Sequence, residues 1–91
     1  MMNPDQREQV RLTMLGVLAA NPTKYGLPVR YLRNALANGG IRATDAEVES
    51  EVLYLVDKKL AEEVTKILSP ENQAWRITAA GRDFLAERGI E

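Results

Sequence analysis

The hydrophobic period of this chain changes near residue 60, and that change limits the folds open to it. Before that point the apolar residues recur at helical spacing, whereas two short strand-like runs follow, joined by Ser-Pro-Glu-Asn-Gln. A five-residue connection of this kind is typical of a hairpin, expected over about 64–78. The helices are expected over about 4–20, 28–38, 45–59 and 79–88. The order predicts a mostly α domain with a small β-hairpin (α/α/α/β/β/α).

Local signals at the helix ends support these boundaries. Asn3-Pro4 is a typical helix start, with a capping side chain followed by a proline that fits the first helical position. Gly39-Gly40 ends the second helix, since glycine takes the left-handed conformation cheaply. Thr44 and Glu47 have the spacing of a capping box that opens the third helix. Thr78 is expected to cap the last helix.

The hairpin is expected to pair symmetrically about its five-residue loop. This register places Ile67 opposite Trp75 on an apolar face. Lys66 then lies opposite Arg76 on the other face, where two like charges repel one another unless an anion lies beside them.

Composition limits the chemistry available to the chain. Its 91 residues predict one domain spanning 1–91. The absence of cysteine removes disulfides and thiolate metal sites, and the absence of histidine removes the commonest general base and metal ligand. Gly39-Gly40 lacks the Lys-Ser/Thr that a phosphate-binding P-loop requires. We therefore expect no enzyme activity, no cofactor and no metal site.

The sequence also contains features that predict where in the cell the protein is found. No apolar run approaches the roughly 20 residues that span a bilayer. The first residues, MMNPDQREQ, contain no basic patch followed by an apolar stretch, so no secretory signal is expected. These features predict a cytoplasmic protein that does not bind membranes.

The charges are segregated along the chain, although the net charge is only −1. Between Gln9 and Thr44 there are five basic residues and no acid. Between Asp45 and Glu63 there are seven acids and two lysines. A near-neutral total therefore hides a basic first half followed by an acidic third helix and its continuation.

Two short motifs connect the chain to a known superfamily. The stretch LVDKKL, residues 55–60, resembles the end of the third helix in winged helix-turn-helix regulators of the MarR and PadR type. The stretch WRITAAG, residues 75–81, is similar to the exit from their second wing strand. These families often have glycine where this chain has Lys59, so a less tight helix exit is expected. A weaker resemblance, through SPENQAWRITAAGRDFLAE, is to small winged-helix proteins of Mu-like prophages.

The resemblance implies how such a domain would meet DNA. The third helix would enter the major groove, while the second helix and the wing would contact the backbone. The residues expected to contact phosphates are Arg30, Arg33, Arg42, Lys66 and Arg76. The residues expected on the recognition face of the third helix are Ala46, Glu47, Ser50 and Tyr54.

The third helix is unusually acidic for that role. A helical wheel centred on Val52 places Asp45 and Glu49 near the core boundary, leaving Glu47 on the outer face and Glu51 on one flank. Glu47 and Glu51 are four residues apart and repel one another, so helix stability alone does not explain them.

The first helix has a broader apolar face than a small core needs. Its extra edge, formed by Leu12, Leu15 and Ala19, is expected to meet a second copy, giving a homodimer. The resemblance implies a regulator of transcription that binds double-stranded DNA, of the kind found in prophages. The alternative is a winged-helix module that binds a basic protein surface and not DNA, because the acidic third helix would repel phosphates.

Overall fold

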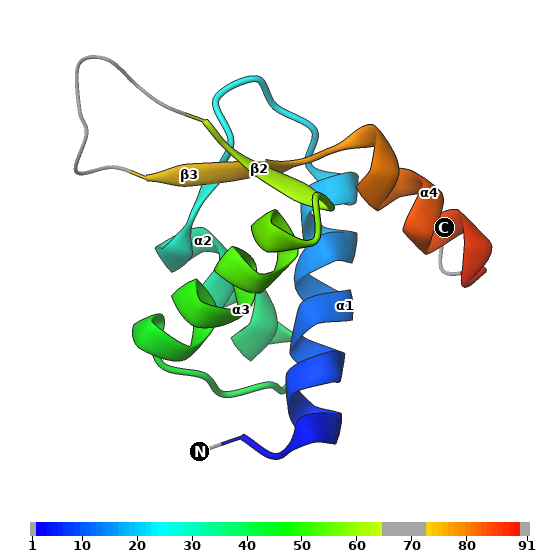
Figure 1. The fold of residues 1–91 in the computed structure, drawn as a ribbon. Coiled ribbons are helices and arrows are strands. Elements are labelled where there is room, and N and C mark those ends of the chain that lie inside the picture. Colours follow the sequence, from blue (N-terminus) through cyan, green and yellow to red (C-terminus); the bar gives the residue numbers. More distant parts are fainter. Residues whose placement is uncertain (1, 65–72, 90–91) are drawn as a thin grey trace.

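The computed structural model describes residues 2–64 and 73–89 of the chain. It shows a mostly helical protein with a small three-stranded antiparallel sheet (Figure 1). The elements in chain order are α1 (Pro4–Ala20), β1 (Leu27–Pro28), α2 (Val29–Asn38), α3 (Asp45–Asp57), β2 (Ala61–Val64), β3 (Ala74–Ile77) and α4 (Ala79–Glu87).

The first and third helices both begin with a complete capping box, of which the sequence analysis predicted the one at Thr44 and, for the first helix, only the cap at Asn3. The Asn3 side chain accepts a hydrogen bond from the Gln6 backbone N–H at 2.8 Å, and the Asn3 backbone N–H donates to Oε1 of Gln6 at 3.0 Å. Thr44 and Glu47 exchange the same pair of bonds at 3.1 and 2.9 Å. Each box satisfies two backbone donors that have no partner inside the helix.

The exit from α3 is tighter than the sequence predicted. The helix ends at Asp57, and Lys59 takes the left-handed conformation with φ of 67°. The backbone N–H groups of Lys59 and Leu60 donate to the carbonyls of Val56 and Leu55, both at 2.9 Å. This is a Schellman motif, which usually has glycine at the left-handed position. The expectation of a looser exit was therefore wrong, and the chain turns directly into β2.

The three strands lie in the order β1-β3-β2, and both pairings are antiparallel. In β2, Ala61 pairs with Ile77 and Glu62 with Arg76. The short strand β1 places Leu27 opposite Trp75. The sheet therefore has one strand more than the predicted hairpin, added by the segment between α1 and α2.

The predicted hairpin register was wrong. The partner of Trp75 is Glu63, not Ile67, and the partner of Arg76 is Glu62, not Lys66. Because the tight exit from α3 starts β2 at residue 61, the pairing of β2 with β3 is set at the point where the chain leaves α3. It is not set by the loop that joins the two strands. Residues 65–72, including Lys66 and Ile67, lie outside the described residues.

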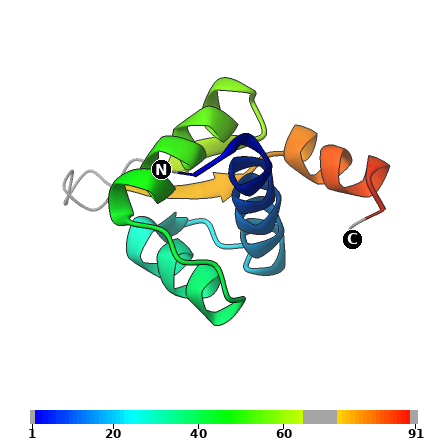
Figure 2. The ribbon, with the colours of Figure 1, turned by 90° about the horizontal axis from the view of Figure 1, so that it is seen from below.

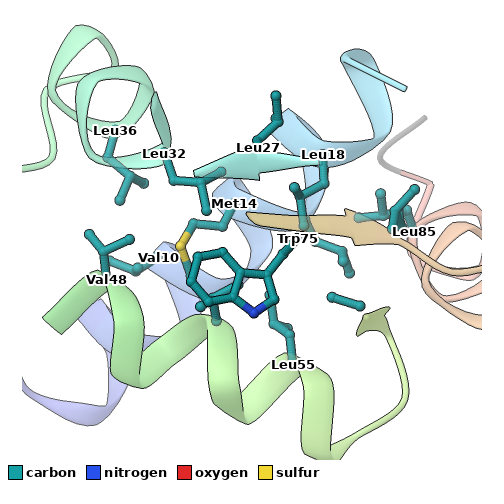
Figure 3. Packing of buried hydrophobic residues seen from close by; sticks show 14 residues of the cluster. Val10, Met14, Leu18, Leu27, Leu32, Leu36, Val48, Leu55, Trp75 and Leu85 are labelled. Carbon is teal, nitrogen blue, oxygen red and sulfur yellow. The ribbon is translucent and has the colours of Figure 1, made fainter. Parts of the chain in front are cut away.

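The hydrophobic core lies where the first three helices meet the inner face of the sheet. Figure 3 shows the Trp75 side chain pointing from β3 toward α3, among aliphatic side chains from both ends of the sequence. Trp75 is only 1% exposed. The other fully buried side chains are Val10, Met14, Leu15, Leu18, Leu32, Leu36, Val48, Val52 and Leu85.

The last helix projects to one side of this core (Figures 1 and 2). Its start is held in place by Thr78, whose hydroxyl accepts from the Gly81 N–H at 3.0 Å and donates to the Lys59 carbonyl at 2.7 Å. A Cβ atom at Gly81 would collide with the Leu60 carbonyl oxygen and lie 2.7 Å from Cγ1 of Ile77. The predicted cap at Thr78 is confirmed, and Gly81 lets the start of α4 pack closely against Leu60 and Ile77.

Candidate functional site

The sequence analysis left two carboxylates of the acidic third helix unexplained, and the structure places one of them inside the protein. Glu51 is 2% exposed. Its Oε1 accepts from Nε of Arg11 at 2.6 Å, and its Oε2 accepts from Nε of Arg7 at 3.1 Å. Burying a carboxylate is costly unless it is paired in this way. Glu51 therefore joins α3 to α1 and does not face a binding partner.

Arg11 also explains the position of Tyr54. Its guanidinium carbon lies 3.6 Å from the centroid of the Tyr54 ring, and the Lys58 amine lies 5.6 Å from the same centroid. These contacts direct the ring toward α1, and Tyr54 is 37% exposed. Tyr54 is thus exposed as predicted, and its ring lies on the flank of α3 that faces Arg11.

Glu47 is likewise occupied within its own chain. Its carboxylate accepts from the Thr44 backbone N–H at 2.9 Å. This bond favours the charged form and lowers the pKa of Glu47 below its ordinary value. Both carboxylates that the sequence left unexplained thus have intramolecular partners.

The outward face of α3 includes residues beyond those predicted. The structure confirms Ala46 and Ser50 as exposed. Glu49, expected near the core boundary, is exposed instead, and Leu53 is 45% exposed. The reason is that the buried side of the helix includes Glu51 as well as Val52, and this shifts the outward direction. We define the α3 ridge as Glu49, Leu53 and Asp57, which follow one another at intervals of four residues.

The α3 ridge presents an apolar side chain between two carboxylates. No lysine or arginine occurs between Asp45 and Asp57. A ridge of this composition suits a basic partner surface that also carries apolar groups.

Two of the predicted phosphate contacts are paired with acids. Nη1 of Arg33 lies 3.0 Å from Oδ1 of Asp45, at the start of α3. Nε of Arg76 lies 3.1 Å from Oε1 of Glu62, its cross-strand neighbour. The like-charge pair expected on this face of the hairpin is thus a pair of opposite charges.

The remaining predicted phosphate contacts differ from these two. Arg30 and Arg42 are exposed, and neither forms an ion pair with any described residue. They lie at opposite ends of α2, one in its first turn and one in the connection after it. Lys66, the last of the predicted set, falls in the part of the chain that the structure does not describe.

The expected dimer surface is only partly available. Leu15 has an exposed fraction of 0% because it belongs to the core, so its assignment to a dimer surface was wrong. Leu12 and Ala19 are half-buried. Leu12 lines a groove of about 620 Å³ between α1, the end of α3 and α4, together with Leu60 and Phe84.

Comparisons with known proteins add no identity. The chain matches no protein-family model, and no curated protein aligns with it significantly. Within residues 2–64 and 73–89 there is no group of three or more carboxylates placed to hold a metal ion. Among the same residues, no helix combines the length and the apolar character needed to cross a membrane.

Proposed function

We propose that this chain is a winged-helix domain that binds a basic protein surface through the α3 ridge. The topology supports the fold assignment, because three helices precede a two-stranded antiparallel wing and β1 joins the sheet between α1 and α2. In a domain of this kind, α3 is the helix presented to a partner.

The composition of the α3 ridge carries the proposal. Phosphate neutralisation by lysine and arginine supplies most of the non-specific affinity for DNA, and α3 contains neither. Glu49 and Asp57 would repel a phosphate backbone but attract lysine and arginine on a protein. Leu53 adds apolar area that becomes buried on association.

DNA binding and transcription regulation remain the second candidate, supported by Arg30 and Arg42. Both are exposed and have no described carboxylate partner, so both are able to contact phosphates. Fluorescence anisotropy with a mixed-sequence duplex across a salt series tests this candidate. Binding that weakens steeply with salt, and less steeply in Arg30→Ala plus Arg42→Ala, would support DNA over protein.

The protein-binding proposal is tested with a synthetic amphipathic helical peptide in which lysines flank a row of leucines. Glu49→Gln plus Asp57→Asn should weaken binding. The matched control, Asp83→Asn plus Glu87→Gln, removes two exposed carboxylates from α4 and should leave binding unchanged. Leu53→Ala removes no charge, so a loss of affinity in this variant separates docking on the ridge from general electrostatic attraction.

Either of two results would reject the protein-binding proposal. One is equal weakening by the α3 and α4 pairs of substitutions. The other is tight, salt-sensitive duplex binding combined with no binding of the peptide.

A further inference from the structure

A second hollow is lined entirely by residues outside α3. It occupies about 340 Å³ and is lined by residues from the end of α1, the following turn, β3 and the start of α4. Figure 1 shows where these elements come together. The residues that line it are Leu18, Pro22, Thr23, Lys24, Arg76, Ile77 and Arg82. It shares no residue with the α3 ridge.

Three cations from three separate segments gather around this hollow. Lys24 comes from the turn after α1, Arg76 from β3 and Arg82 from α4. Among the residues that the structure describes, no carboxylate lines the hollow, although Glu62 binds Nε of Arg76 from the neighbouring strand at 3.1 Å. By comparison, the two arginines that bind Glu51 in another part of the fold are both paired with a carboxylate. The hollow is thus a place where positive charge is concentrated and only partly compensated.

The hydrogen-bonding groups around the hollow are mainly donors. Only Nε of Arg76 is used by Glu62, so its two terminal nitrogens still carry donor hydrogens. The Thr23 hydroxyl accepts from the Tyr25 backbone N–H at 3.2 Å and can donate its own hydrogen to a ligand. Lysine and arginine donors of this kind make short, strong hydrogen bonds to phosphate oxygens.

We propose that this hollow binds a phosphate group. The convergence of three cations on one small volume suits a compact dianion more than an extended chain of charges. The remaining walls are the aliphatic side chains of Leu18 and Ile77 and the ring of Pro22, which offer no aromatic platform for a base. Recognition is therefore directed at the phosphate and not at what carries it.

The test is a titration of the ¹⁵N-labelled chain with inorganic phosphate, followed by NMR at constant ionic strength set with sodium chloride. Saturable shifts of the Lys24 and Arg82 backbone amides are expected. Binding should be tighter at about pH 7.5 than at about pH 5.5, because inorganic phosphate changes from mainly monoanion to mainly dianion between these two pH values. Shifts that never saturate, or that do not favour the dianion, would overturn the proposal.

Substitutions locate the site. Arg82→Gln and Lys24→Gln should each weaken phosphate binding by about tenfold, the loss expected for one charge-assisted hydrogen bond. Lys58→Gln removes an exposed cation at the end of α3, away from the hollow, and should leave the affinity unchanged. Circular dichroism confirms that each variant is folded. Equal affinities in Arg82→Gln and the unsubstituted chain would exclude the hollow as the binding site.

Two further ligands identify the source of the phosphate. Adenosine 5′-monophosphate presents a free phosphate ester, and a single-stranded oligonucleotide presents phosphodiesters. Binding of adenosine 5′-monophosphate with the same dependence on Arg82 would make a phosphate monoester the source. Tighter binding of the oligonucleotide, whose phosphodiesters carry one charge each, would overturn the preference for a dianion. If neither displaces inorganic phosphate that binds saturably at the Lys24 and Arg82 amides, free phosphate itself is the ligand.

Discussion

Nε of Arg11 lies 2.6 Å from Oε1 of Glu51, although the two residues are 40 positions apart in the sequence. Glu51 is almost completely buried, whereas the Arg11 side chain keeps 21% of its exposure. The pair connects the first helix to the third at the edge of the core.

We expect substitutions in this network to destabilise the fold in a defined order. Arg11→Ala leaves the buried Glu51 with only its longer bond to Arg7, and should lower the free energy of unfolding by about 3 kcal/mol. Arg7→Ala should cost only about 1 kcal/mol, because this arginine is 46% exposed. Glu49→Ala, on the exposed face of the same helix, should change stability by less than about 0.5 kcal/mol. Urea unfolding measures all three, and equal costs for the two arginines would contradict the burial of Glu51.

The left-handed conformation of Lys59 predicts a stabilising substitution. Lys59→Gly removes the steric cost of a Cβ atom at positive φ and should raise the free energy of unfolding by about 0.5–1 kcal/mol. Lys58→Gly provides the control, because it removes the same charge at a position with φ of −83°. It should stabilise nothing, since only the flexibility of the unfolded chain increases. Thermal unfolding of the two variants distinguishes these outcomes, and stabilisation by both would point to charge and not to backbone strain.

Glycine-to-alanine changes should have opposite effects in the first and last helices. Gly81→Ala places a methyl group against the Leu60 carbonyl and Ile77, and should destabilise the fold by about 1–3 kcal/mol. Gly16→Ala meets no atom within 4 Å inside α1, so it should stabilise by about 0.5–1 kcal/mol. Chemical denaturation of the pair is the measurement. A cost at both positions would mean that the packing at Gly81 is not what distinguishes them.

The capping box of α3 predicts a contribution to stability that depends on pH. The hydrogen bond from the Thr44 backbone N–H lowers the pKa of Glu47 in the folded chain below its ordinary value of 4.5. The stabilisation is therefore fully present above that ordinary value and is lost as pH falls through the lower folded pKa. Carbon-13 NMR titration of the Glu47 carboxyl group measures the folded pKa directly. Glu47→Gln keeps an acceptor at the cap but cannot titrate, so this part of the acid sensitivity should disappear. A folded pKa at or above 4.5 would contradict the prediction.

Local rules account for the parts of this fold that were predicted well. The first helix spans Pro4–Ala20 as expected, and the predicted cap at Thr44 is present. Each depends on groups only a few residues apart, so the sequence carries the information within one turn. The same holds for Thr78, which caps α4 through the Gly81 backbone.

The candidate site was predicted less well, because its residues are placed by contacts between distant segments. The wheel for α3 assumed that the buried side consists of apolar residues, and the burial of Glu51 rotates that side. Arg7 and Arg11 are four residues apart, a spacing that allows two arginines to hold one group. The sequence around Arg7 and Arg11 does not show that this group is a carboxylate of the third helix.

The sequence by itself determined where the helices begin, that a strand pair follows them, and that positive and negative charges occupy different parts of the chain. Tertiary structure decided which of those charges are available to a partner. The hairpin register follows from the left-handed turn at Lys59. Lysine rarely adopts this conformation, and the neighbouring residues did not predict it. The physical reason is the same for the available charges and for the hairpin register. Burial, ion pairing and strand register depend on which distant segments meet, and those contacts form only when the whole core packs.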